Sequence, residues 1–291
     1  MMLRFSRIAL AALVVIVAHQ SASAQFTVLS QNTLHLGWGK VPYQTNKNAY
    51  LFNTVIRTNP NPPVFDVVIL QEVMQQANLA ALSQQFLPGA YTVVQTPALG
   101  PGNYKETYGF LVRVAAQGYT CCNIIPKPTG QTYHTYTGGG FSRPPSGVLV
   151  QSANNTTWVI NYHAMFGAVG ARRTEVSKVA LAVPQFQALP MGNPANQYPR
   201  YVVGGDWNFP ISDQVFAYIN GQLGGNLNGQ PTGLTSIKPR GVGLSSSYDH
   251  FLWDTTRVVC ANPLVMPDNG SLPTFRTTFS DHLGVRIHVQ Q

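Results

Sequence analysis

Short apolar runs rich in β-branched and aromatic residues recur along this chain. Runs of this kind, bounded by glycine, proline and polar residues, are typical of buried β-strands. They fall at residues 26–30, 67–70, 91–94, 109–114, 147–151, 157–162, 201–203, 250–253 and 285–289. A chain with so many buried strands must bury them in sheets that pack against one another or against helices.

Helical patterns are fewer than strand patterns and do not alternate with them one for one. Helices are predicted at 47–57, 78–86 and 172–186. This ratio favours an α/β fold of two sheets packed on each other with helices outside, rather than a simple doubly wound sheet. Residues 96–103 and 221–247 are predicted as long loops, the second with little ordered structure. Strand-like segments follow both loops, so we expect one domain over 25–291.

The first 24 residues have the pattern of a secretory signal peptide. Arg4 and Arg7 precede an apolar run over 8–18, and Ala22-Ser23-Ala24 provides a small-residue cleavage signal. The run is too short to span a hydrocarbon core of about 30 Å. We therefore expect cleavage near Ala24, a secreted or periplasmic location and no stable membrane association.

The chain is basic, with 18 Lys and Arg against 10 Asp and Glu, for a formal net charge of +8. Such a charge suits a polyanionic partner, and it equally suits solubility alone. Of the three cysteines, Cys121 and Cys122 are adjacent in sequence. Adjacent cysteines rarely bond each other, so we expect one of them to pair with Cys260.

Half of the ten acidic residues lie at the ends of predicted strands. Five carboxylates are placed in this way: Glu72, Glu106, Asp206, Asp249 and Asp281. A carboxylate at the end of a buried strand is costly unless it is paired or bound to metal. If they converge on one sheet edge, their oxygens form a site that suits Mg²⁺.

Two histidines add acid and base groups to these carboxylates. His163 ends the strand at 157–162, and His282 follows Asp281. Each motif alone is commonly a turn or a structural contact, but their joint occurrence at strand ends favours a hydrolytic site. In such a site a metal neutralises charge on a phosphate, one histidine activates water and the other protonates the leaving oxygen.

The ordered motifs resemble the endonuclease/exonuclease/phosphatase superfamily. They are S-Q-N (30–32), L-Q-E-V (70–73), N-Y-H-A (161–164), G-G-D-W-N (204–208), S-Y-D-H (247–250) and S-D-H (280–282). Within the superfamily, the segments at 97–113 and 141–145 resemble secreted deoxyribonuclease I, and the chain is also similar to the catalytic subunit of cytolethal distending toxin. The resemblance implies a four-layer sandwich of two packed mixed β-sheets flanked by helices.

The resemblance also implies a role for each site residue. Glu72 and Asp281 would bind the cation, Mg²⁺ or Mn²⁺, with Asn32 close by, and Ca²⁺ is a candidate structural or activating ion. The remaining roles are these: His282 as general base oriented by Asp249, His163 as general acid paired with Glu106, Asp206 and Asn208 on the scissile phosphate or a second metal, Arg143 on a backbone phosphate, and Tyr104 against a sugar or base.

The implied activity is metal-dependent cleavage of DNA with low sequence specificity. One departure is Met74, which stands where deoxyribonuclease I has an arginine that enters the minor groove, so we expect one contact with duplex DNA to be missing. Two alternatives stay open from the sequence. One is a lipid phosphodiesterase or phosphoinositide phosphatase of the same superfamily, and the other is a toxin catalytic subunit with a protein partner.

Overall fold

The computed structural model describes residues 25–56, 65–102, 104–114, 121–153, 155–189, 199–240, 242–267 and 271–290. The predicted signal peptide at 1–24 lies outside these ranges. No helix within them is long and apolar enough to span a membrane.

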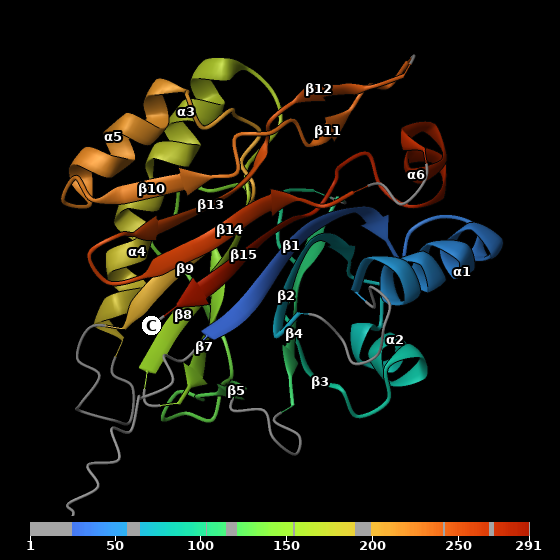
Figure 1. The fold of residues 1–291 in the computed structure, drawn as a ribbon, viewed down its shortest axis with the longest axis horizontal. Helices are drawn as coiled ribbons and strands as arrows, with labels where there is room; N and C mark the ends of the chain where they lie inside the picture. The colour runs from blue at the N-terminus through green and yellow to red at the C-terminus, as the bar shows by residue number, and fades with distance from the viewer. Residues whose placement is uncertain are drawn as a thin grey trace, which may run out of the picture.

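Two mixed β-sheets form the centre of the molecule (Figure 1). The first runs in the order β14 (Val259–Val265), β15 (Val285–Gln290), β1 (Gln25–Leu36), β2 (Val67–Met74), β4 (Glu106–Arg113), β3 (Tyr91–Gln95). The second runs β10 (Leu227–Gln230), β13 (Asp249–Asp254), β9 (Arg200–Asp206), β8 (Asn155–His163), β7 (Ser146–Ser152), β5 (Cys121–Ile124), with β6 (His134–Thr135) beside β7. The pairs β1–β2 and β8–β9 are parallel, and the other neighbours in both sheets are antiparallel.

Helices cover the outer faces of both sheets (Figure 1). The six-stranded sheet carries α1 (Val41–Tyr50), the π-helical turn η1 (Leu51–Ile56), α2 (Leu79–Phe86) and α6 (Leu272–Thr278). The seven-stranded sheet carries α3 (Val169–Ser177), α4 (Val179–Ala188) and α5 (Gln214–Gln222). Three apolar clusters fill the layers, one between the sheets and one beneath each set of helices. This arrangement confirms the predicted four-layer sandwich.

The sheets also contact each other through buried polar side chains. Gln71 on β2 donates from Nε2 to Oδ1 of Asn161 on β8 at 2.6 Å, and Asn161 donates back to the Leu70 carbonyl at 2.9 Å. Gly204 on β9 permits the close approach, because a Cβ there would lie 2.5 Å from the Phe251 ring and 2.8 Å from the Ile69 side chain. The amide pair therefore fixes the alignment of the two sheets at one end of the core.

All nine predicted strands are present, but the loop prediction for 221–247 is wrong. This segment contains the end of α5, strand β10 and the hairpin of β11 (Ser236–Ile237) and β12 (Leu244–Ser246). β10 pairs with β13 through backbone hydrogen bonds and needs few apolar side chains, so its sequence shows little strand pattern.

The helix predictions are correct in place and differ at the boundaries. The helix predicted at 47–57 begins earlier, at Val41, with a proline in its first turn. The helix predicted at 172–186 is two helices, α3 and α4, which meet at Lys178.

The cysteine prediction is also wrong. Cys121 and Cys122 are bonded to each other, and Cys260 has no disulfide partner in the described chain. Cys121 begins β5 of one sheet while Cys260 lies on β14 of the other.

Candidate active site

The site residues lie on the inner faces of the two sheets because side chains alternate along a strand. On β8, Trp158, Ile160 and Tyr162 pack beneath the helices, whereas Val159 packs between the sheets. His163 lies four residues after Val159, on the same face of β8, and therefore faces the other sheet. The same alternation along the other strands places four further side chains on the inner faces at one end of the sandwich: Asn32, Glu106, Asp206 and Asp249.

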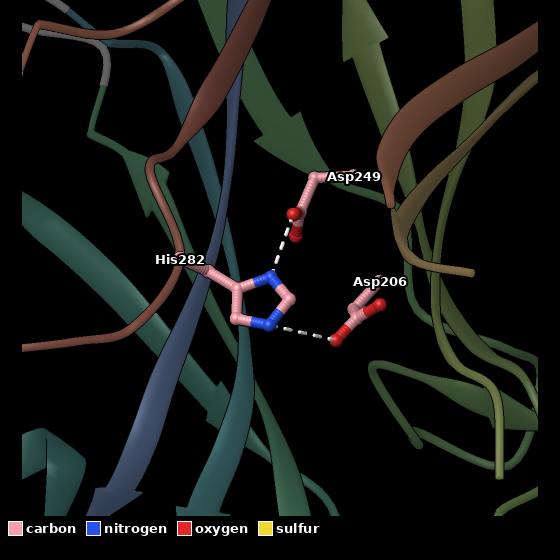
Figure 2. Close-up of side chains that lie close together, drawn as sticks. All are labelled: Asp206, Asp249 and His282. Carbon is pink, nitrogen blue, oxygen red and sulfur yellow. Dashed lines mark hydrogen bonds and ion pairs between the residues drawn. The ribbon is translucent and has the colours of Figure 1, made fainter. Parts of the chain in front are cut away.

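His282 lies between two carboxylates (Figure 2). Its Nδ1 is 2.7 Å from Oδ2 of Asp249, and its Nε2 is 3.6 Å from Oδ2 of Asp206. Burial alone lowers the pKa of His282, but the charges of Asp249 and Asp206 outweigh it and raise the pKa well above its usual value. The bond to Asp249 orients the ring so that Nε2 faces Asp206.

His163 forms a second buried pair of the same kind. Its Nδ1 is 2.7 Å from Oε1 of Glu106, and its Nε2 is 3.8 Å from Oδ2 of Asp206. Burial lowers the pKa of His163, but the charge and hydrogen bond of Glu106, together with the charge of Asp206, raise the pKa overall. The structure thus brings both predicted histidine–carboxylate pairs together around one oxygen of Asp206.

Arg143 lies behind the second pair. Its Nε is 2.7 Å from Oε1 of Glu106 and 3.2 Å from the His163 carbonyl, and one terminal nitrogen donates to the Ala164 carbonyl at 2.8 Å. The side chain is buried, so these bonds fix Glu106 beneath the imidazole. The predicted contact of Arg143 with a DNA phosphate stays a prediction.

Asn32 joins the carboxylates of the two sheets. Its Nδ2 donates at 3.1 Å to both Oε1 of Glu72 and Oδ2 of Asp206, while its Oδ1 accepts from the Leu34 amide at 2.9 Å. Glu72 lies within a bulge in β2, between Leu70 and Val73, and has a φ of 54°. This bulge turns the Glu72 side chain toward the inner face, out of the regular alternation of β2.

Asp281 occupies a more open position than Glu72. Its Oδ2 is 3.5 Å from a terminal nitrogen of Arg276, and its side chain is 26% exposed. Burial lowers the pKa of the Lys47 ammonium to about 8, while the negative charges of Glu72 and Asp281 act to raise it. Both predicted cation ligands therefore lie near Lys47, but their joint binding of one cation stays a prediction.

Asn208 and Tyr104 border the site. The backbone amide of Asn208 donates to Oδ1 of Asp206 at 2.9 Å, and its side-chain Nδ2 donates to the Ala164 carbonyl at 2.9 Å. Tyr104 places its hydroxyl 3.5 Å from Oε2 of Glu72. Both residues reach the carboxylates assigned from sequence, and their contact with substrate stays a prediction.

Backbone strain is concentrated at the site. Six non-glycine residues of the described chain have a positive φ, and four of them are Leu34, His35, Glu72 and Asn208. Such conformations persist only where surrounding contacts impose them, and they cluster at functional sites. The strain agrees with a site whose backbone is held in place by its hydrogen bonds.

Sequence reasoning missed two groups of residues at this site. Thr235 and Ser236 form one group: the Thr235 hydroxyl accepts from the amides of Tyr248 and Asp249, and the Ser236 hydroxyl lies 3.4 Å from Nε2 of His282. They precede and begin a hairpin inside the segment predicted as a loop. The other group is His35 with Trp38, whose only signal was a histidine and a tryptophan shortly after Asn32.

Met74 is the position at which the sequence departs from the deoxyribonuclease I pattern. The residue is 3% exposed and pairs with Glu106 in the β2–β4 register. Met74 is therefore buried in this structure, and its effect on duplex binding stays a prediction.

The donor set fits a divalent cation. Asp206, Asp249 and His282 each offer one ligand atom, and these atoms lie within 4.8 Å of one another. The buried Oδ1 of Asp249 and Oε2 of Glu106 have no hydrogen-bond partner in the described structure. Carboxylate oxygens are the ligands that Mg²⁺ prefers, and buried unpaired carboxylate oxygens favour a positive charge nearby.

Comparisons with known proteins agree with this fold and site. The profile of the Endonuclease/Exonuclease/phosphatase family matches residues 30–282, and the chain belongs to that family. It is therefore a hydrolase of the phosphodiesterase, phosphatase and nuclease class, whose members use divalent metals. A search of curated proteins found no match.

Solved structures share the fold at low sequence identity. The human Nocturnin catalytic domain with bound sulfate is 15% identical, with a TM-score of 0.58, over 92% of this chain and 94% of that one. A mannosyl-6-phosphatase from Bacteroides thetaiotaomicron is 15% identical, with a TM-score of 0.58, over 91% of this chain and 99% of that one. D. rerio TDP2 complexed with a single-strand DNA product is 15% identical, with a TM-score of 0.55, over 92% of this chain and 99% of that one. These likenesses establish the fold and leave the substrate open.

Proposed function

We propose that this protein is a secreted, metal-dependent endonuclease, similar to deoxyribonuclease I, that hydrolyses phosphodiester bonds of DNA. The observation that carries the proposal is the placement of the two imidazoles. Both direct Nε2 toward the same Asp206 oxygen, at 3.6 Å for His282 and 3.8 Å for His163. An in-line displacement at phosphorus needs a proton acceptor on one side and a proton donor on the other.

His282 is the proposed general base. Its Nδ1 is held by Asp249, so Nε2 is the nitrogen that removes a proton from water as the water oxygen attacks phosphorus. Asp249 is fully buried and stabilises the imidazolium that results. Asp249 thus acts through His282 and is a positioning residue.

His163 is the proposed general acid. As the bond from phosphorus to the leaving oxygen breaks, Nε2 of His163 gives its proton to that oxygen. Glu106 raises the pKa of His163 against burial, which favours the protonated ring that this role needs. Arg143 supports this role because it holds Glu106 against Nδ1.

Glu72, Asp206 and Asn32 would hold the cation or the scissile phosphate, with Asp281 as the predicted partner of Glu72. When bound, Mg²⁺ or Mn²⁺ would neutralise charge on the phosphate oxygens and favour the neutral, proton-accepting form of His282.

Nucleic acid is the favoured substrate because the chain is basic and Tyr104 lies beside the proposed phosphate position. Recognition would depend mainly on phosphates, so we expect low sequence specificity and strong salt dependence. Similarity to TDP2, which was solved with a DNA product, agrees with this choice. Secretion is proposed from the pattern of residues 1–24 alone.

The test is a set of assays on the mature protein. Plasmid DNA, incubated with Mg²⁺ and separately with chelator, should be nicked only with Mg²⁺. Phosphoinositide vesicles and a sugar phosphate serve as parallel substrates. Phosphate release from either of these without any nicking of DNA would overturn the nuclease proposal and leave the family assignment intact.

A further inference from the structure

Three ring side chains meet beside the proposed phosphate position. The ring centroids of His35 and Trp38 are 5.3 Å apart, those of His35 and Tyr104 are 5.4 Å apart, and those of Trp38 and Tyr104 are 5.8 Å apart, all in edge contacts. His35 also reaches Glu72, with 3.1 Å between Nε2 and Oε2. We call His35, Trp38 and Tyr104 the aromatic cluster.

Trp38 exposes a large apolar surface that the proposed reaction does not use. It is 50% exposed, whereas Trp158, Trp207 and Trp253 are 1%, 0% and 3% exposed. Indole is normally buried unless its face has a partner. An exposed indole in contact with a residue that touches a catalytic carboxylate is therefore a candidate substrate contact.

The loop that carries Trp38 is fixed by hydrogen bonds at several points. The Gly37 amide donates to Oε1 of Gln44 at 2.8 Å, and the Gln44 side chain donates in turn to the Trp38 carbonyl. The buried Lys47 ammonium donates to the Leu34 carbonyl. A surface held in place in this way loses little conformational entropy when a ligand binds.

We propose that the aromatic cluster binds one unpaired nucleobase of the substrate by stacking, with Trp38 as the main contact. This inference rests on the proposed nuclease function. A planar base covers an indole face well, and in a duplex both faces of a base are already covered by its neighbours. The protein therefore prefers single-stranded or frayed DNA to fully paired DNA at the nucleotide next to the scissile phosphate.

Binding is tested first, without catalysis. A short single-stranded oligonucleotide in chelator should quench the tryptophan emission of the wild type, since only Trp38 among the four tryptophans is exposed. An oligonucleotide of abasic units with the same number of phosphates should quench it little. The Trp38→Phe variant should lose the quenching and keep most of the affinity, because phenylalanine also stacks.

Cleavage is tested on the same two backbones. Trp38→Ala should lower kcat/KM on the base-containing strand about 5- to 150-fold, the equivalent of the roughly 1–3 kcal/mol of one stacked base, and leave the abasic strand unchanged. Trp38→Phe should restore most of the loss. Tyr218→Ala is the matched control, because Tyr218 is 53% exposed on α5 and lies outside the aromatic cluster.

The outcomes separate this inference from the proposed function. If the wild type cleaves both strands and Trp38→Ala leaves their ratio unchanged, stacking on Trp38 is excluded while nuclease activity stands. If Trp38→Ala lowers both rates equally, Trp38 holds the loop and does not bind a base. If the wild type cleaves no DNA, the proposed function fails and this inference fails with it.

Discussion

The bond between His282 and Asp249 leads to the most specific prediction. If Asp249 acts only by orienting His282, its removal has no effect once the imidazole is gone. We therefore consider His282→Ala, Asp249→Asn and the double variant. Asn has nearly the volume of Asp, so the second change removes the charge and leaves packing intact.

The expected magnitudes come from the geometry. A general base contributes roughly 10²–10⁴ in rate, or about 3–5 kcal/mol of transition-state stabilisation, and His282→Ala should lose that much. The contact from Nδ1 to Oδ2 is 2.7 Å and Asp249 is fully buried, so Asp249→Asn should lose a large part of the same factor. The double variant should be no slower than His282→Ala alone, within about twofold.

The assay is kcat/KM on plasmid DNA at fixed Mg²⁺ and salt. Breaking a buried ion pair costs roughly 3–5 kcal/mol of stability, so each variant also needs a thermal unfolding curve and an assay temperature below its midpoint. Asp254→Asn is the matched control: Asp254 ends the same strand, β13, and pairs with Arg257 at 3.8 Å. It should cleave at the wild-type rate.

Losses that multiply in the double variant would refute this reasoning. Such a result would mean that Asp249 has a function of its own, for example as a cation ligand, since its buried Oδ1 has no hydrogen-bond partner in the described structure.

Three other changes test the remaining parts of the site. Mg²⁺ should raise the unfolding midpoint of the wild type by mass action, and Glu72→Ala should remove most of that rise in calorimetry; an undiminished rise would place the cation elsewhere. His163→Ala should lower DNA cleavage by roughly 10²–10⁴ but have little effect on a p-nitrophenyl phosphodiester, whose leaving group needs no proton; equal losses would exclude the acid role. Burial lowers the pKa of Lys47 to about 8, below that of the unfolded chain, so between about pH 8 and 10.5 only the unfolded chain keeps this proton. In chelator, the unfolding free energy of the wild type should therefore rise over this interval by on the order of 3 kcal/mol relative to Lys47→Met, and parallel curves for the two proteins would contradict the shift.

Much of the fold was predictable because buried strands carry a local signal. Polar residues at the ends of these strands, such as His163 on β8, indicated which side chains come together. β8 is buried on both faces, so its sequence does not show which face lies between the sheets. The sequence carried little signal for the strands that are held mainly by backbone pairing. β14 is an edge strand with partly exposed side chains and an internal proline, so its sequence shows little strand pattern.

The sequence could not predict the direction of side chains that depends on tertiary contacts. Arg143 has a long side chain that could reach solvent or the interior, and the buried Glu106 holds it in the interior. The direction of the Asp281 side chain also depends on a tertiary contact, because α6 brings Arg276 next to it. Met74 is buried by the pairing of β2 with β4, which no local pattern indicates.

Asn32 belongs to one sheet and Asp206 to the other, yet a single 3.1 Å hydrogen bond joins them at the centre of the site. Catalytic geometry therefore exists only when both sheets have formed and docked. Activity is thus a direct reporter of folding: during refolding, cleavage should appear no earlier than the last global step, after strand formation is complete by circular dichroism. Either sheet alone would be inert, so a partly folded or truncated chain would have no hydrolytic activity.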